Sequence, residues 1–222
     1  MKSPKPSTNK DRTHGDGSRV LRKNTREPSP CVPQAVEALL AGDPVIFPTD
    51  TVYGLGVAVG YAKTPEILYV LKERDHGKPV AWLVGSGEDL RTYGKDVPEY
   101  AFTLAETFWP GDLTLVVKAA DSVPAAFRAP GDTIALRMPN NETALTLINQ
   151  VKAPLATTSA NISGQHPPET FTELDERLLA KVPVALADET QKSGTASTVV
   201  DCTGSHPIII REGNIPLAAL SS

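Results

Sequence analysis

The sequence has little cysteine, with only Cys31 and Cys202 among 222 residues. No C-x-x-C pair occurs, which excludes a zinc ribbon, and two cysteines cannot build a disulfide framework. We expect two free thiols, with a single bridge between them as the alternative. No His-x-x-x-His or other cluster has the spacing of metal ligands, so we predict no protein-held catalytic metal; the histidines are His14, His76, His166 and His206.

Long hydrophobic runs are also missing. No stretch of about 18 apolar residues occurs, so no transmembrane helix is expected. The charged N-terminus is not followed by an apolar segment, so we expect no secretory signal. The composition, 40% hydrophobic and 22% charged, is typical of a globular domain. We therefore expect a cytoplasmic protein with no membrane partner.

Several familiar catalytic motifs are absent as well. There is no G-x-S-x-G nucleophile elbow. The glycines of GLGVAVG, residues 54–60, lack the spacing of a dinucleotide loop and precede no predicted helix. The GSG at residues 85–87 is followed by neither Lys nor Thr and is not a P-loop. Serine hydrolase, dinucleotide-binding and P-loop functions are thereby excluded.

The net charge of −4 conceals an asymmetry. Residues 1–30 hold eight lysines and arginines against three acids, a net charge of +5, and the rest of the chain carries −9. This basic segment is rich in Pro, Ser, Thr and Asn and cannot bury a core. We predict a disordered tail over residues 1–30 and one folded domain over residues 31–218. The tail is either a weak RNA-contacting arm or a solvated segment without function.

From Pro33 onward, strand-like and helix-like patterns alternate. The segment that begins at Thr64 is the clearest helix, with Thr64 as N-cap, Pro65 at the first position and Gly77 as terminator. The alternation predicts an α/β domain with a twisted, mixed sheet. The remaining expected helices cover residues 33–42, 98–111, 142–151 and 173–182, and the expected strands cover 44–48, 54–60, 80–84, 113–118, 133–139, 154–160, 185–189, 197–202 and 207–212.

Cations and small polar residues follow several of these elements. Lys72 and Arg74 should be partly exposed and can converge if the chain unwinds at residues 75–77; they suit phosphate oxygens, or else complement a helix C-terminus. TTSANISG, residues 157–164, is either an anion nest or a plain turn that closes a strand. Arg137 and Arg211 could equally be buried against structural acids.

Seven segments then occur together in a characteristic order: PTDTVYGLG, LKERDHGKPVAWLV, FWPGDLTLVV, TIALRMP, TTSANISG, STVVD and IIIREG. In these the chain resembles the YrdC-like family over residues 33–216, and within it the bacterial single-domain L-threonylcarbamoyladenylate synthases. The resemblance implies an α/β fold with a mixed parallel and antiparallel sheet, flanking helices and a positively lined cavity. It also implies formation of threonylcarbamoyl-AMP and diphosphate from L-threonine, bicarbonate and ATP.

The resemblance assigns residues to this reaction. The family's K-x-R and S-x-N signature falls on Lys72, Arg74, Ser159 and Asn161, which would be catalytic and hold the ATP phosphates. Further ATP contacts would be Thr114, Thr157 and Arg211, and threonine contacts Thr51, Arg137 and Ser197. Some relatives carry a nucleotide-binding serine where this chain has Pro167-Pro168.

The implied chemistry explains the missing motifs. The threonine amine would form a carbamate that attacks the α-phosphorus, so no side-chain nucleophile is needed. Mg²⁺ would be held mainly by phosphates and water. A threonylcarbamoyl-transferase complex would pass the group to tRNA, and the sequence leaves direct contact between this chain and tRNA open. The alternative function is a non-catalytic YrdC-like protein that binds double-stranded RNA, tRNA or ribosomes, which the acidic domain and the lack of an aromatic and basic platform argue against.

Overall fold

The computed structural model describes residues 31–74, 79–188 and 190–220. Within them one mixed sheet runs in the order β10-β9-β5-β6-β3-β7-β2-β1-β8, and β4 adds to β5. The pairs β1–β8, β3–β6 and β5–β9 are parallel and the others antiparallel, which confirms the predicted mixed α/β fold. The strands are β1 Val45–Phe47, β2 Gly54–Ala58, β3 Ala81–Leu83, β4 Gly94–Lys95, β5 Leu113–Ala119, β6 Thr133–Arg137, β7 Leu155–Ser159, β8 Val184–Ala185, β9 Thr198–Asp201 and β10 Ile208–Arg211.

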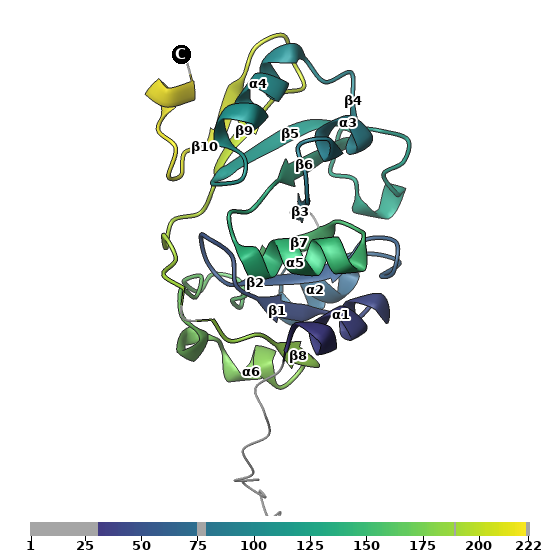
Figure 1. The fold of residues 1–222 in the computed structure, drawn as a ribbon, viewed down its shortest axis with the longest axis vertical. Helices are drawn as coiled ribbons and strands as arrows, with labels where there is room; N and C mark the ends of the chain where they lie inside the picture. Colours follow the sequence, from purple (N-terminus) through teal and green to yellow (C-terminus); the bar gives the residue numbers. More distant parts are fainter. Residues whose placement is uncertain (1–30, 75–78, 189, 221–222) are drawn as a thin grey trace, which may run out of the picture.

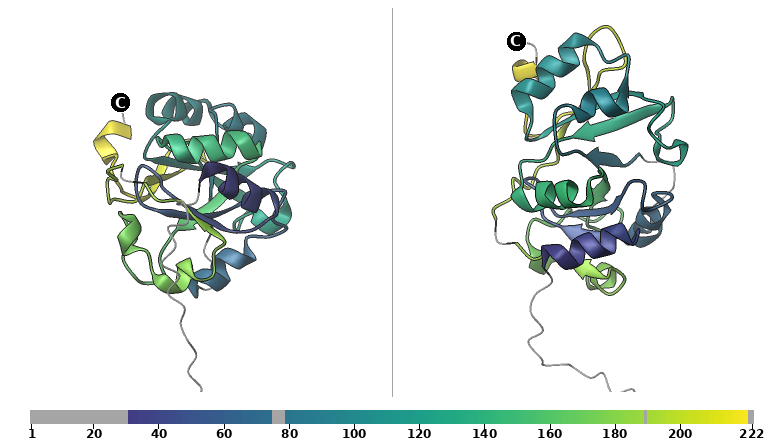
Figure 2. Two further views of the ribbon diagram at one scale, coloured as in Figure 1. Left: turned by 60° about the horizontal axis from the view of Figure 1, so that its bottom comes forward. Right: turned by 45° about the vertical axis from the view of Figure 1, so that its right-hand side comes forward.

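Helices cover the sheet over much of its length (Figure 1). The α-helices are α1 Val32–Leu40, α2 Glu66–Lys72, α3 Asp89–Tyr93, α4 Glu99–Phe108, α5 Glu142–Val151 and α6 Glu176–Leu179; short 3-10 turns are η1 Ala125–Phe127, η2 Phe171–Glu173 and η3 Leu217–Leu220. The two views of Figure 2 show α1 and α5 side by side on one face of the sheet, where their apolar faces pack together.

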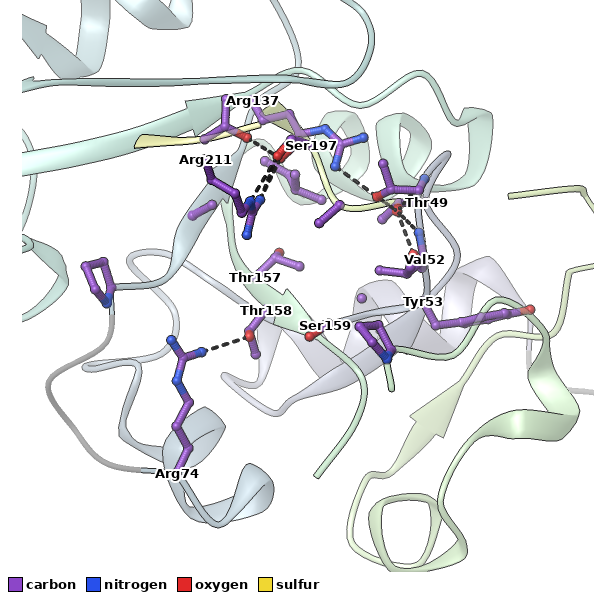
Figure 3. Close-up of a pocket in the computed structure, with 18 residues that line it drawn as sticks. Thr49, Val52, Tyr53, Arg74, Arg137, Thr157, Thr158, Ser159, Ser197 and Arg211 are labelled. Atoms are coloured by element: carbon purple, nitrogen blue, oxygen red, sulfur yellow. Dashed lines mark hydrogen bonds between the residues drawn. The ribbon is translucent and has the colours of Figure 1, made fainter. Parts of the chain in front are cut away.

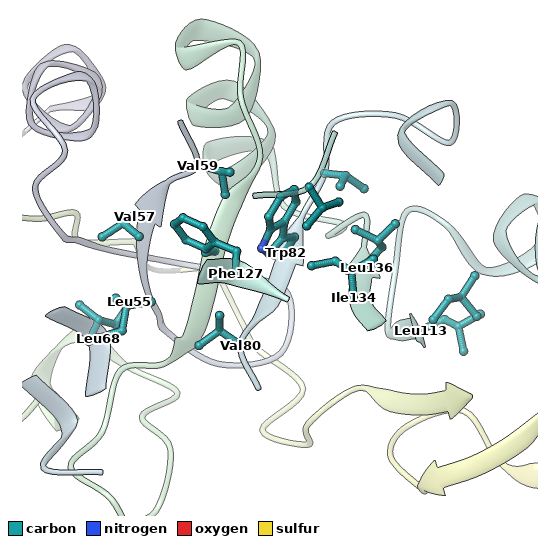
Figure 4. Packing of buried hydrophobic residues seen from close by; sticks show 14 of the residues in the cluster. Leu55, Val57, Val59, Leu68, Val80, Trp82, Leu113, Phe127, Ile134 and Leu136 are labelled. Atoms are coloured by element: carbon teal, nitrogen blue, oxygen red, sulfur yellow. The ribbon is translucent and has the colours of Figure 1, made fainter. Parts of the chain in front are cut away.

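A second apolar cluster fills the other face of the sheet around Trp82, which is fully buried (Figure 4). The rings of Tyr93 and Phe127 meet the Trp82 ring edge-on, with centroids 5.3 and 5.9 Å away. Such edge-to-face pairs add to the stabilisation that burial of the aromatic area gives. The two apolar clusters thus pack against opposite faces of the sheet and fix the positions of the strand ends that form the site.

The structure corrects some of the predicted elements. The expected helix over residues 173–182 is wrong: Leu174 is extended, and the Asp175 carboxylate caps a single turn, α6, by accepting from the Arg177 amide. The expected strand over residues 185–189 is wrong beyond Ala185, which ends β8, because residues 186–188 are not in a strand; residue 189 lies outside the described residues. The helix predicted from Thr64 starts at Glu66 instead, and the Thr64 hydroxyl accepts from the Glu66 amide at 3.3 Å.

The glycines of β2 make room for protein rather than only for a ligand. A Cβ on Gly56 would lie 2.8 Å from the Thr157 hydroxyl and 3.1 Å from the Phe47 ring, and one on Gly54 would lie 3.1 Å from the Thr157 methyl. β2 is an interior strand between β1, which carries Phe47, and β7, which carries Thr157. The side chains of Phe47 and Thr157 can extend over β2 only where β2 itself has no side chain. The glycines therefore position Thr157 within the sheet.

Two further expectations concern thiols and membranes. Cys31 and Cys202 are free thiols, as predicted, the first exposed and the second buried. Among the described residues, no helix has the length and apolar character needed to cross a bilayer. The predicted tail over residues 1–30, the unwinding at residues 75–77 and the terminator Gly77 lie outside the described residues.

Candidate functional site

A cavity of about 310 Å³ opens where β7, the turn after β1 and the start of β9 come together (Figure 3). Three arginines and several hydroxyls line it. Of the ten residues assigned from the sequence, eight lie in its wall: Thr51, Arg74, Thr114, Arg137, Thr157, Ser159, Ser197 and Arg211. The other two, Lys72 and Asn161, do not.

Arg74 reaches the cavity because the chain reverses just after α2. The helix ends at Lys72, and Glu73 adopts a left-handed conformation with φ 52°, which turns the next side chain back toward β7. There the Arg74 Nη1 donates to Thr158 Oγ1 at 3.2 Å. Its Nε is buried and has no hydrogen-bond partner. Burial lowers the pKa of this guanidinium, so the site holds a cation that lacks a full set of partners.

Lys72 is buried, with 3% exposure, so the expectation that it would be partly exposed is wrong. Its Nζ donates to the Ser159 carbonyl, to the Asn161 carbonyl at 2.7 Å and to Asn161 Oδ1 at 3.1 Å. An ammonium has only three protons to donate. In this conformation the Lys72 ammonium therefore bonds to the turn after β7 and does not line the cavity.

Asn161 belongs to the same closed network. Its Nδ2 donates to the carbonyls of Ile162 and Gln165 at 2.9 and 2.7 Å. The Ser163 amide, part of the segment predicted as a candidate anion nest, donates to the Lys72 carbonyl. The turn is thus tied to the end of α2, and it is Ser159, ahead of it, that faces the cavity.

Arg137 lies at the opposite side of the cavity from Arg74 (Figure 3), and two acids pair with it. Its Nη2 donates to Asp50 Oδ1 at 2.7 Å and to Asp112 Oδ1 at 3.0 Å, and its Nε donates to the Gly111 carbonyl at 2.9 Å. Burial, followed by the hydrogen bond and charge of Asp50, raises the pKa of Asp112 even though Asn214 and Arg137 oppose the shift. The alternative that Arg137 is buried against structural acids is therefore confirmed, and it lines the cavity as well.

The hydroxyl of Thr51 has a defined orientation. Thr49 Oγ1 donates its one proton to the Val52 carbonyl at 2.6 Å, so the 3.0 Å contact between the two threonine hydroxyls must use the Thr51 proton. Arg137 Nη1 donates to Thr51 Oγ1 at 3.0 Å. One lone pair of the Thr51 hydroxyl remains, and it can accept a hydrogen bond from an N–H or O–H group of a ligand.

Ser197 sits where three elements meet. Its hydroxyl lies 2.7 Å from Thr114 Oγ1 on β5. Arg211, from β10, donates to the Ser197 carbonyl through Nε at 3.1 Å and Nη2 at 2.8 Å. The β-strands 5, 9 and 10 thus bring together hydroxyls and a cation that are up to 97 positions apart in the sequence.

Sequence reasoning missed several wall residues. Thr158 partners Arg74; it lies inside the 157–164 segment, but the resemblance assigned only Thr157 from its threonine pair. Thr49, which orients Thr51, lies two residues before it in the PTDTVYGLG segment but was not assigned a role by the resemblance. Pro167 also lines the cavity, and the neighbouring Pro168 carbonyl accepts from the Tyr53 amide at 2.8 Å.

Comparison with known families gives an independent result. The profile of the Sua5/YciO/YrdC family, described as "Telomere recombination", matches residues 37–213. That match spans most of the chain and contains all ten of the residues assigned above. The chain belongs to this family.

Individual relatives agree with this membership. A threonylcarbamoyl-AMP synthase of Pyrococcus abyssi is 38% identical over 176 residues, which cover 79% of this chain and 52% of the relative. A Mycobacterium tuberculosis protein is 37% identical over 181 residues, covering 82% of this chain and 83% of the relative. The solved structure of P. abyssi Sua5 in complex with L-threonine matches with a TM-score of 0.80 at 35% identity, over 86% of this chain and 56% of that one. The chain therefore spans about half the length of the P. abyssi relative.

Proposed function

We propose that the chain is an L-threonylcarbamoyladenylate synthase, a nucleotidyltransferase that forms threonylcarbamoyl-AMP and diphosphate from L-threonine, bicarbonate and ATP. The observation that carries the proposal is the cavity itself, with an incompletely bonded arginine on one side and an oriented acceptor hydroxyl on the other. The names of the relatives and the threonine complex of the P. abyssi protein support the same reaction.

The phosphates of ATP bind at the Arg74 side. The buried Nε of Arg74 lacks a partner, and a guanidinium edge suits two phosphate oxygens at once. The Ser159 hydroxyl adds a donor, and Thr114, Thr157 and Arg211 supply the remaining nucleotide contacts. Lys72 and Asn161, assigned to the phosphates by the family signature, contribute by holding the turn that directly follows Ser159.

Threonine binds at the opposite side, against Thr51, Arg137 and Ser197. The Thr51 hydroxyl has one acceptor site left, which fits a proton of the substrate's amino or hydroxyl group. Asp50 and Asp112 together carry one more charge than Arg137, so this side is not a strong anion site. A small zwitterion is therefore favoured here over a phosphate.

The reaction needs alignment more than side-chain chemistry. The deprotonated threonine amine attacks the carbon of CO₂, derived from bicarbonate, and gives a carbamate. A carbamate oxygen then attacks the α-phosphorus, and the bond to the bridging oxygen breaks to release diphosphate. Arg74 stabilises charge on the phosphate oxygens, and the cavity holds the two anions in line.

A magnesium ion with ATP fits the donor set of the cavity. Hydroxyls but no carboxylates appear in its described wall, and the described residues contain no group of three or more His, Cys, Asp or Glu that could hold a metal. Mg²⁺ would thus be held mainly by phosphate oxygens and water, where it neutralises phosphate charge.

The product must pass to another enzyme. A threonylcarbamoyl-AMP is a reactive mixed anhydride, and its consumer would be a threonylcarbamoyl-transferase complex that modifies an adenosine next to the tRNA anticodon. We propose that the protein acts in the cytoplasm, and direct contact with tRNA is a separate proposal.

Diphosphate release from ATP and Mg²⁺ tests the proposal, with threonine and bicarbonate omitted in turn. We expect release only when both are present, and mass spectrometry should detect threonylcarbamoyl-AMP. A folded protein that releases no diphosphate under any combination, but binds double-stranded RNA or tRNA in a filter assay, would favour the non-catalytic function instead.

A further inference from the structure

Lys192 is a buried cation that the proposed reaction does not use. Its residue is 6% exposed, and its side chain lies among Tyr53, Asp188 and Thr190. The Nζ lies 4.5 Å from the centre of the Tyr53 ring, donates to the Thr190 carbonyl at 3.0 Å and is 4.0 Å from Asp188 Oδ1. Burying an ammonium is costly, so such a position calls for compensating contacts of this kind.

Tyr53, under this cation, belongs to the turn that carries Thr51. Its hydroxyl donates to the Asp188 carbonyl at 2.9 Å and accepts from the Asp188 amide at 3.0 Å. Its backbone carbonyl accepts from the Ala160 amide at 2.8 Å, next to Ser159. Figure 3 shows its ring pointing away from the cavity. Tyr53 therefore lines the cavity, but its ring lies behind the wall, where the hydroxyl is bonded to Asp188.

The residues that follow Lys192 run directly onto that turn. We call residues 190–197 the strap. The Ser193 amide donates to the Asp50 carbonyl and the Gly194 amide to the Thr51 carbonyl, both at 3.0 Å. The strap then ends at Ala196 and Ser197, which line the cavity. One short segment thus connects the buried lysine to both Thr51 and Ser197.

We propose that Lys192 is a positioning residue that seats the strap on Tyr53 and so fixes Thr51 and Ser197 at the correct separation for a small amino acid. The proposal rests on the proposed function, because it concerns the threonine side of the same cavity. The lysine touches no substrate. Its contribution passes through the two amide contacts of Ser193 and Gly194, which the cation–π contact and the Thr190 carbonyl hold in register.

The test compares the full wild-type chain with Lys192→Met, Lys192→Arg and, as a matched control, Lys118→Met on the exposed side of β5. Methionine keeps the apolar stem but removes the charge, whereas arginine restores a cation over the ring. We expect Lys192→Met to raise the KM for threonine about tenfold, with kcat and the KM for ATP changed less than about twofold. Lys192→Arg should recover most of the loss, and Lys118→Met should match wild type.

Hydrogen exchange of the amides gives a readout that does not depend on catalysis. Peptides covering residues 190–197 should exchange faster in Lys192→Met than in wild type, while β5 and β6 stay unchanged. Unchanged exchange in the strap would overturn the positioning role. Faster exchange with an unchanged threonine KM would overturn the link to the substrate. If wild type itself forms no threonine-dependent product, the proposed function fails, and the exchange experiment still decides what Lys192 does.

Discussion

Two arginines on opposite sides of one cavity have contrasting surroundings. Arg137 donates to two carboxylates, a hydroxyl and a carbonyl. Arg74 donates to the Thr158 hydroxyl, its buried Nε has no partner, and none of the described carboxylates pairs with it. The resemblance assigned both residues to the site, yet of the two it is Arg74 whose buried Nε has no hydrogen-bond partner.

The difference indicates what each side can bind. A guanidinium that is already paired with two acids has little attraction left for phosphate, but it organises the hydroxyl beside it. An unpaired, partly buried guanidinium is destabilising by itself and gains a full set of partners when a phosphate arrives. Stability and function are therefore divided between the two residues, and substitutions can separate them.

The largest effect is expected from Arg74→Gln. Because this side chain makes one hydrogen bond within the described residues, to Thr158, and is proposed to neutralise phosphate charge, kcat/KM for ATP should fall about 100-fold or more. Its free energy of unfolding should change by less than about 1 kcal/mol. Diphosphate release and urea unfolding measure the two quantities.

Arg91→Gln provides the control for that experiment. Arg91 is an arginine that stacks over the Phe102 ring at 4.0 Å and does not line the cavity. Its activity should equal that of wild type. A near-wild-type rate in Arg74→Gln would show that the phosphates bind elsewhere.

Arg137→Met should mainly reduce the free energy of unfolding, in contrast to Arg74→Gln, which should mainly reduce activity. It leaves Asp50 and Asp112, which are 14% and 22% exposed in their side chains, without their shared cation. Removing one partner of a buried ion pair costs about 3 kcal/mol of unfolding free energy. Urea denaturation at neutral pH should detect this loss.

Asp112→Asn sharpens the same comparison. Burial and Asp50 already raise the pKa of Asp112, so removing its charge should cost less than about 1 kcal/mol. Combined with Arg137→Met, it should recover part of the lost stability because one carboxylate instead of two is left unpaired. If the double variant is as unstable as Arg137→Met alone, the two acids do not destabilise each other.

The smallest effect is a change in pH profile from Lys72. Burial, and then the charge of Arg74, lower the pKa of Lys72 from 10.5 to about 8. Above that pH the ammonium loses a proton and one of its bonds to the turn that directly follows Ser159, so the rate should decline a few-fold between pH 8 and 9. Lys72→Arg stays charged in this range, and its ratio of rates at pH 9 and pH 7 should be higher than that of wild type.

The unfolding free energy of wild type should follow the opposite trend. Between about 8 and 10.5 the unfolded chain binds more protons at Lys72 than the folded one, so stability rises with pH across that window. The favourable contribution is complete above the upper value and disappears as the pH falls through about 8. If the ratio of reaction rates at pH 9 and pH 7 is the same in wild type and Lys72→Arg, the ammonium has no role in holding the turn.

Much of the fold could be read from local sequence. Apolar runs with turn residues at their ends correctly predicted β1, β2, β5, β6 and β7. Helices with a clear apolar face and punctuation, such as α5, were also correct. The segment around Asp175 failed because its helix-like pattern contains a residue that caps a turn and an extended Leu174 before it. Local patterns cannot rank a cap against a helix interior without knowing what the segment packs against.

The site divides along the same line. The sequence by itself determined the residue types, since hydroxyls, arginines and glycines after strand ends are written in the chain and match a family. Only the tertiary structure decided how each is used. It buried Lys72 under the turn, paired Arg137 with acids 87 and 25 positions away, and left Arg74 open to the cavity. The physical reason is that a charge is satisfied or left free by its three-dimensional neighbours, and those come from strands far apart in sequence that the sheet brings together.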